Sequence, residues 1–155
     1  MSTMFICNHV ISGAAIGLLL EDRPAAAFIA GVASHFVLDA IPHWGLPDGI
    51  EENLEAQFIK VAKIDGCLGC ALIGALLLAS PTKSSVAAGI AGACLPDLDK
   101  PAKYFFGITP FPKWWQDFHR RANNQRVGLG PREIVIGVVG FTAVLGAMSL
   151  RRRAT

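Results

Sequence analysis

Three ionisable side chains follow one another at four-residue intervals in the apolar stretch SHFVLDAIPHWG, residues 34–45. On a helix, His35 and Asp39 would lie on one face about 5–6 Å apart, where they could bind one metal ion or the aspartate could orient the histidine. His43 follows Pro42 and could reach the same place from a loop. A purely structural pair, hydrogen bonded internally or facing headgroup water, is the alternative. Ionisable residues inside apolar segments are costly and usually functional.

A second candidate is LPDLDKP, in which two carboxylates follow a proline that ends an apolar segment. Asp97 and Asp99 are separated by one residue, and an irregular turn would let both point toward one cation. The same D-x-D pattern also occurs in solvated loops and helix caps. Beside two histidines from another segment, we expect these aspartates to bind metal.

Two further ionisable residues lie near the starts of apolar segments: His9 in the first segment and Asp65, in AKIDGCLG, in the third. Imidazole nitrogens and carboxylate oxygens are the ligands of zinc and of dinuclear zinc, manganese or iron sites, where bound water becomes a nucleophile near neutral pH. We expect His9 to be a metal ligand, and Asp65 or His43 to act as general base or to support a ligand. No P-loop or G-x-G-x-x-G motif indicates a different chemistry.

His119 lies in WWQDFHRRANNQ, directly before Arg120 and Arg121. It is a candidate metal ligand or general acid, and the two arginines could hold a phosphate or another anionic group. The alternative is an ordinary basic helix at the membrane surface.

The composition places these residues in a membrane. Of 155 residues, 52% are hydrophobic and 17% are charged, whereas a soluble domain has about 25% charged residues. The net charge of +2, without a basic stripe outside one loop, argues against nucleic-acid binding. The four cysteines fall in or beside apolar runs and do not resemble a secreted disulfide framework. We expect one helical membrane domain over residues 1–155.

Five apolar segments supply the helices that must position these residues. The second, third and fifth segments reach or approach the roughly 20 residues that a spanning helix needs, whereas the first and fourth are shorter. We therefore predict an all-α polytopic membrane protein with about five apolar helices, four or five of them spanning. The segments are approximately residues 5–20, 24–41, 61–79, 84–95 and 133–150.

A long polar and aromatic connection, residues 96–132, separates the last two segments. Its stretch FPKWWQDFHRRANNQR predicts an interfacial helix with Trp114 and Trp115 near the lipid headgroups.

If the helices alternate in direction, all the candidate residues lie on one side of the membrane. The start of the first helix, the end of the second, the start of the third and the end of the fourth then share a face with the long connection. More Lys and Arg residues fall on this face than on the other, which favours a cytoplasmic site. The terminal arginines 151–153 argue the other way.

Taken together, these motifs resemble those of the YdjM-like family of bacterial membrane-bound metal-dependent hydrolases. LPDLDKP is similar to that family's L-P-D-[IL]-D-x-P, and FHRRANN to its H-R-x-x-T-H-S. The resemblance implies a protein of the bacterial cytoplasmic (inner) membrane, with Asp97, Asp99 and His119 as metal-site residues and His9, His35 and Asp39 lining the same pocket. Asn124 stands where the family has a second histidine, so one ligand is missing unless His43 or Asp65 replaces it.

These features favour a membrane-embedded hydrolase of an ester or phosphoester bond, with a divalent metal cofactor, zinc first and manganese or iron as alternatives. Its expected partners are membrane lipid and a lipid-linked or phosphorylated substrate. The competing hypothesis is a non-catalytic membrane subunit or scaffold with a structural metal or a buried His/Asp network, associated with another membrane protein or with copies of itself. A transporter is disfavoured because the polar residues lie at helix ends rather than at mid-depth.

Overall fold

The computed structural model describes residues 4–45, 52–126 and 128–154, and these are almost entirely helical. The elements are α1 (Ile6–Leu19), α2 (Pro24–Ala40), β1 (His43–Trp44), α3 (Glu52–Ala79), α4 (Lys83–Cys94), the 3-10 helix η1 (Leu95–Leu98), α5 (Asp99–Phe106), α6 (Lys113–Ala122), β2 (Gln125–Arg126) and α7 (Gly130–Ala154). The all-α prediction is confirmed, and all five apolar segments form helices.

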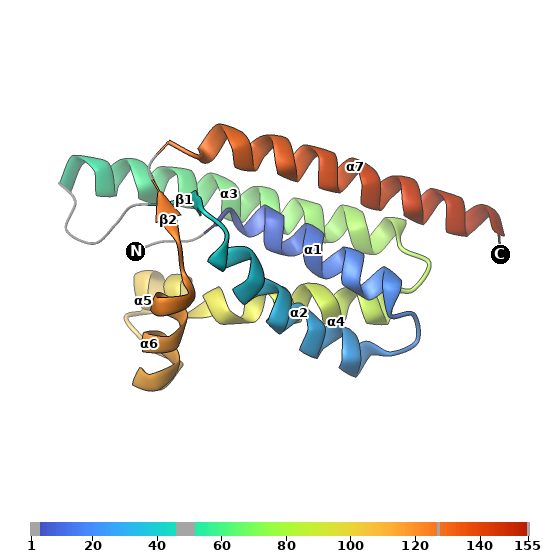
Figure 1. Ribbon diagram of the computed structural model, residues 1–155, viewed down its shortest axis with the longest axis horizontal. Helices are drawn as coiled ribbons and strands as arrows, with labels where there is room; N and C mark the ends of the chain where they lie inside the picture. Colours follow the sequence, from blue (N-terminus) through green and yellow to red (C-terminus); the bar gives the residue numbers. More distant parts are fainter. Residues whose placement is uncertain (1–3, 46–51, 127, 155) are drawn as a thin grey trace.

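The five apolar helices lie side by side and alternate in direction (Figure 1). Helices α1, α3 and α7 run one way and α2 and α4 run the other, while α5 and α6 lie at the end of the bundle where α2 and α4 finish. The start of α1, the end of α2 and the end of α4 therefore meet at one end, as the sequence predicts.

Glycines allow α4 to pack directly against the backbones of α1 and α2. A Cβ atom on Gly13 of α1 would lie 2.5 Å from the carbonyl oxygen of Gly89 on α4, and a Cβ on Gly89 would collide with the carbonyl of Gly13. Gly31 of α2 faces Gly89 in the same way, and Gly92 faces the carbonyl of Phe28. Backbones can approach this closely only where side chains are absent.

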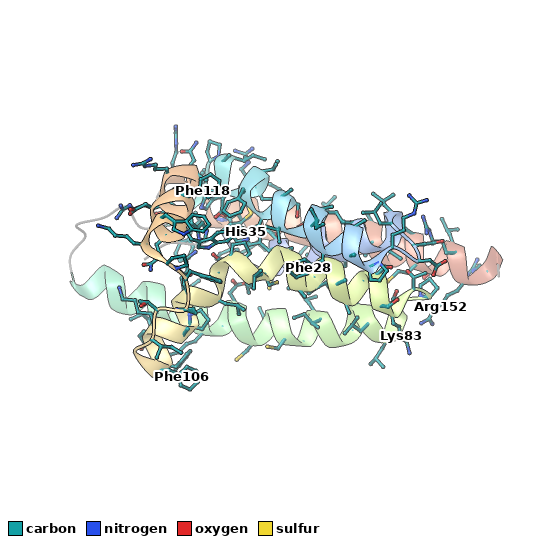
Figure 2. All side chains as sticks on the ribbon, turned by 90° about the horizontal axis from the view of Figure 1, so that it is seen from below. Phe28, His35, Lys83, Phe106, Phe118 and Arg152 are labelled. Carbon is teal, nitrogen blue, oxygen red and sulfur yellow. The ribbon has the colours of Figure 1, made fainter. Side chains whose placement is uncertain are left out.

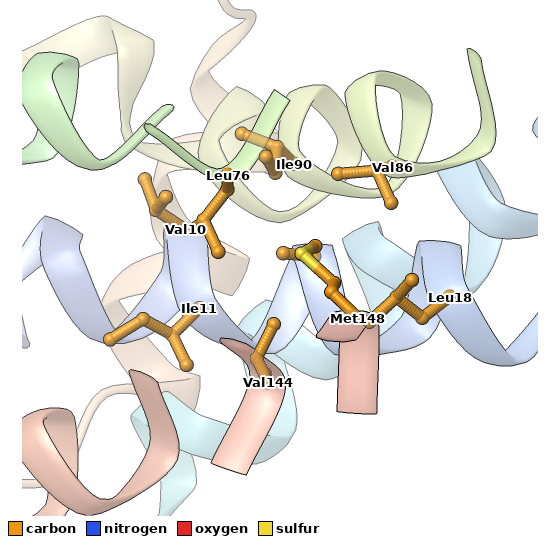
Figure 3. Packing of buried hydrophobic residues seen from close by; sticks show 9 residues of the cluster. Val10, Ile11, Leu18, Leu76, Val86, Ile90, Val144 and Met148 are labelled. Carbon is orange, nitrogen blue, oxygen red and sulfur yellow. The ribbon is translucent and has the colours of Figure 1, made fainter. Parts of the chain in front are cut away.

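A hydrophobic core joins the other face of α1 to α3, α4 and α7 (Figure 3). Leu76 of α3 and Met148 of α7 are among its largest fully buried side chains. The core consists of Val10, Ile11, Ala14, Leu18, Leu76, Val86, Ile90, Val144 and Met148. The long apolar helices α3 and α7 therefore pack against the rest of the bundle along one side.

In the part of the chain that the structure describes, two helices are long and apolar enough to cross a bilayer: Ile59–Ala79 within α3 and Gly130–Arg153 within α7. Only 11% and 17% of their apolar windows are buried inside the protein, so most of their apolar surface faces outward. Helices α1 and α2 are apolar but shorter. The expectation of four or five spans remains a prediction.

The long connection contains more structure than its sequence indicated. The predicted interfacial helix is α6, but α5 and the parallel pairing of β1 with β2 were not predicted. In this pairing His43 lies opposite Gln125, and the His43 N–H donates to the Asn124 carbonyl over 3.1 Å. The pairing joins the chain just after α2 to the chain just after α6.

Candidate metal centre

Four buried side chains from three parts of the chain meet at the end of the bundle. His35 and Asp39 come from α2, Asp97 from η1 and His119 from α6, and none is more than 5% exposed. One ligand atom from each lies within 4.8 Å of those of the other three. Figure 2 shows His35 at the same end as Phe118, far from Lys83 and Arg152 at the other end. We call these four residues the cluster.

Five of the six separations between the four cluster atoms match the edges of a coordination tetrahedron. The Nε2 atoms of His35 and His119 are 3.1 Å apart. His35 Nε2 lies 3.3 Å from Asp39 Oδ2 and 3.6 Å from Asp97 Oδ1, and His119 Nε2 lies 3.1 and 3.5 Å from the same two oxygens. Tetrahedral zinc with bonds of about 2.0–2.1 Å gives ligand separations of about 3.3 Å. The cluster could therefore hold one metal ion.

A carbonyl group behind His35 sets the orientation of its ring. His35 Nδ1 lies 2.8 Å from the carbonyl oxygen of Ala93 on α4, which can only accept a hydrogen bond. The proton of a neutral ring is therefore on Nδ1, and the Nε2 lone pair faces the cluster. Metal-binding histidines usually have such a partner on the second nitrogen.

Two asparagines after α6 support Asp39. Asn123 Nδ2 donates to Asp39 Oδ2 over 3.1 Å, and the backbone N–H of Asn124 donates to the Asp39 carbonyl over 2.8 Å. The side chain of Asn124 donates to the carbonyl of Ala40 over 3.3 Å. Asn124 thus holds the ends of α2 and α6 together.

Asp97 is held ionised by neighbouring positive charge. Pro96 begins the 3-10 turn that carries Asp97 inward from the end of α4. Burial by itself would raise the pKa of Asp97, but the Lys100 ammonium, which donates to Oδ1, and the nearby His35 hold the pKa below its ordinary value. At neutral pH Asp97 is therefore a carboxylate available to a cation.

Aromatic packing holds α6, and with it His119, against α2. The Phe36 ring lies 4.9 Å from that of Phe118, 5.6 Å from that of Trp115 and 5.7 Å from the His119 imidazole, measured between centroids. All three contacts are edge-to-face, a favourable arrangement for aromatic pairs. Phe36 therefore fixes the helix that supplies the last cluster residue.

His9 borders the cluster from α1. It is fully buried, and its ring stacks on that of His35 with centroids 4.1 Å apart. His9 Nε2 lies 3.3 Å from Asp39 Oδ1, the oxygen that does not face His119. Five of the six predicted ligands are thus brought together: His9, His35, Asp39, Asp97 and His119.

Asp65 lies apart from the cluster, where it caps α1. The backbone N–H groups of Ile6 and Cys7 donate to Asp65 Oδ2 and Oδ1 over 2.5 and 3.3 Å. Glu133 of α7, which sequence reasoning missed, accepts from the Phe5 N–H over 2.8 Å and also from the Trp44 N–H. The first N–H groups of a helix need such partners. The only sequence signal for the cap was the position of Asp65 near the start of an apolar segment, and that position suggested a catalytic role rather than a capping role.

The other predicted residues lie outside the cluster. His43 is buried on β1, with Nδ1 2.9 Å from the Ile41 carbonyl oxygen. Asp99 begins α5 and is half-buried. Arg120 is exposed and donates to Asp117 over 2.7 Å, and Arg121 is also exposed. The structure thus gives Arg120 a carboxylate partner on its own helix.

Comparisons with known proteins identified no relative of this chain. No protein-family model, curated protein or solved structure matches the chain. The resemblance to the YdjM-like hydrolases stays a prediction, and the geometry of the cluster is the main basis for assigning a function.

Proposed function

We propose that this protein is a membrane-embedded, metal-dependent hydrolase with a divalent cation, zinc, in the cluster. The observation that carries the proposal is the tetrahedral spacing of four buried nitrogen and oxygen atoms. Two neutral imidazoles and two carboxylates are a donor set typical of zinc. The resemblance of the motifs to the YdjM-like family supports the same chemistry.

In such a centre, each residue of the chain has a definite task. A bound divalent ion would supply Lewis acidity and lower the pKa of water. His35, oriented by the Ala93 carbonyl, and His119, held by Phe36, would donate nitrogen lone pairs. Asp39 and Asp97 would neutralise the cation. Lys100, beside Asp97, could balance negative charge that develops on a substrate.

The surroundings of the cluster suit a substrate that resides in the membrane. Besides α3 and α7, the shorter helix α2 exposes Ile29 and Val37, which are 69% and 64% accessible, so we propose that it too lies in the bilayer. Trp114 and Phe118 of α6 are 67% and 50% exposed beside the cluster. Aromatic side chains favour the headgroup region. The proposed reaction is therefore hydrolysis of an ester or phosphoester bond in a lipid or a lipid-linked molecule.

We place the protein in the bacterial cytoplasmic membrane on the strength of the motif resemblance. The distribution of Lys and Arg along the chain favours the cytoplasmic face for the cluster.

A second candidate function, a membrane subunit or scaffold with a structural metal or a metal-free network, is favoured by two observations. Four protein ligands complete a tetrahedron and leave no open position, as in structural zinc sites. In addition, Lys100 already supplies a positive charge to Asp97. In this case the exposed apolar faces would contact another membrane protein or a second copy.

Metal analysis of the full chain, purified in detergent, tests both candidates. We expect stoichiometric zinc in the wild type, its loss in Asp97→Ala, and its retention in Asp117→Ala, which removes a carboxylate that pairs with Arg120 at the surface of α6. Zinc-dependent release of phosphate or of a generic ester product would then separate enzyme from scaffold. A wild type that binds no added zinc excludes the hydrolase and the structural metal alike.

A further inference from the structure

Four buried polar atoms beside the cluster have no hydrogen-bond partner in the described part of the chain: both ring nitrogens of His9, Asp39 Oδ1 and Asp97 Oδ2. Three of them, His9 Nε2, Asp39 Oδ1 and Asp97 Oδ2, belong to an imidazole and two carboxylates, which can bind a cation. His9 and Asp39 are 0% exposed and Asp97 is 5% exposed, so bulk water does not solvate these atoms. Burying a polar atom without a partner is costly, and native proteins rarely leave several together. Among the described residues nothing satisfies them, which is the pattern expected around a bound ligand.

Asp39 Oδ1 and Asp97 Oδ2 are the second oxygens of carboxylates whose other oxygen faces the cluster, and His9 Nε2 lies next to the first of them. Asp39 presents Oδ2 to His119 and Oδ1 to His9, whose Nε2 is 3.3 Å away. Asp97 presents Oδ1 to His35 and His119, and its Oδ2 has no hydrogen-bond partner among the described residues. The separation of His9 Nε2 from Asp39 Oδ1 again matches the edge of a zinc tetrahedron, about 3.3 Å.

We propose a second divalent cation, bound by His9 Nε2, Asp39 Oδ1 and Asp97 Oδ2, with both aspartates bridging the two ions. The proposal rests on the function proposed above and extends it from one ion to two. His9 stacks on His35, and its Nε2 faces Asp39 Oδ1, whereas His119 faces Oδ2. Pairs of ions bridged in this way lie about 3.5–4 Å apart.

The two sites differ in how many positions the protein fills. The first has four protein ligands and is closed, whereas the second has three, the number found in catalytic zinc sites, where the fourth position holds water or substrate. The second ion would therefore be the one that activates water, while the first fixes the bridging carboxylates. Two-metal sites clamp the attacking and leaving oxygens of a phosphoryl group. Of the ester and phosphoester substrates proposed above, the inference therefore favours phosphoesters.

A metal-free explanation accounts for only part of the observation. A protonated His9 would pair with Asp39 Oδ1 at 3.3 Å. It would leave Asp97 Oδ2 without a partner, and it would add a positive charge directly above the His35 ring, 4.1 Å away. Two cations bridged by both carboxylates satisfy all three atoms at once.

Titration of the metal-depleted full chain with Mn²⁺ or Zn²⁺ in detergent tests the inference. We expect two equivalents in the wild type and one in His9→Gln. His43→Gln is a matched control, because His43 is an equally buried histidine with an unpartnered Nε2, outside the cluster; it should still bind two equivalents.

Electron paramagnetic resonance of the Mn²⁺-loaded wild type provides a readout that does not depend on any variant. Two bridged ions give an exchange-coupled spectrum, and His9→Gln should convert it to that of an isolated ion. One equivalent with an uncoupled spectrum in the wild type overturns the second site but leaves the proposed function standing. No binding of either metal overturns both.

Discussion

The Nε2 nitrogens of His35 and His119 lie 3.1 Å apart, although the two residues are 84 positions apart in the chain. Because His35 Nδ1 faces a carbonyl, its Nε2 presents a lone pair to this contact unless the ring is protonated. If His119 Nε2 is also unprotonated, two lone pairs face each other and repel at this distance. Either a cation lies at the point that both nitrogens face, or a proton is shared between them. Sensitivity of the fold to chelation distinguishes these two states.

Removal of metal should destabilise the protein. An ion that binds only the folded state stabilises it by about 2.7 kcal/mol when free metal exceeds Kd 100-fold. We expect chelation to lower the Tm of the detergent-solubilised wild type and readdition of zinc to restore it. His119→Ala should have the lower Tm with or without chelator. A chelator-insensitive wild type would support the proton-sharing state.

Asn123 should tune metal affinity without binding the ion. Its amide donates to Asp39 Oδ2, and removing such a supporting partner typically weakens metal binding about 10–100-fold. We expect Asn123→Ala to show this loss in a competition titration with a zinc indicator. Gln116→Ala is the matched control, because this amide of α6 donates to the Phe111 carbonyl instead. Equal affinities for the two variants would remove Asn123 from the centre.

Asp65→Ala should affect stability rather than metal content. The carboxylate accepts hydrogen bonds from the first N–H groups of α1, and loss of a helix cap costs about 0.5–2 kcal/mol. Thermal unfolding should therefore shift to lower temperature, with unchanged bound zinc. If turnover disappeared while Tm and zinc stayed at wild-type values, the general-base role predicted from the sequence would be restored.

The contact between Gly13 and Gly89 should tolerate no side chain. In Gly89→Ala the new methyl group would overlap the Gly13 carbonyl, and relieving it requires α1 and α4 to separate. Overpacking of this kind costs about 1–3 kcal/mol. Gly74→Ala on α3, where a Cβ meets nothing within 4 Å, should not destabilise and can gain about 0.5–1 kcal/mol of helix propensity. Thermal unfolding of both variants measures the difference.

Lys100 should protect the fold against acid. The pKa of Asp97 is lowered in the folded state, so its ionisation stabilises the fold above the unfolded value of about 3.9, and this contribution is lost as pH falls through the folded pKa. In Lys100→Met, the ammonium group that opposes the effect of burial is lost, so the pKa of Asp97 in the folded state rises. We therefore expect the midpoint of acid unfolding to move to higher pH. Lys103→Met, an exposed neighbour, is the control. Circular dichroism with chelator present reports the midpoint, and identical shifts would contradict the assignment.

The sequence was sufficient for the helices and for most of the cluster because both depend on local pattern. Apolar runs broken by proline predicted α1, α2 and α4 within a residue or two, and alternation of direction predicted that His35 and Asp97 would meet. The role of Asp65 was not predictable, since a buried carboxylate can bind a cation or cap a helix, and only tertiary structure selects its partner. The β1–β2 pairing was missed because two-residue strands have no periodicity.

The origin of the cluster residues in α2, η1 and α6 also sets an order of events during biosynthesis. Chains emerge from the ribosome from the N-terminus onward, so His35 and Asp39 are made long before His119. Until α6 has been synthesised, the nascent chain offers an incomplete ligand set, while α1 to α4 are already available for insertion. An ion that needs all four ligands could therefore be bound only after α6 has been made, which would make its loading a late step in maturation.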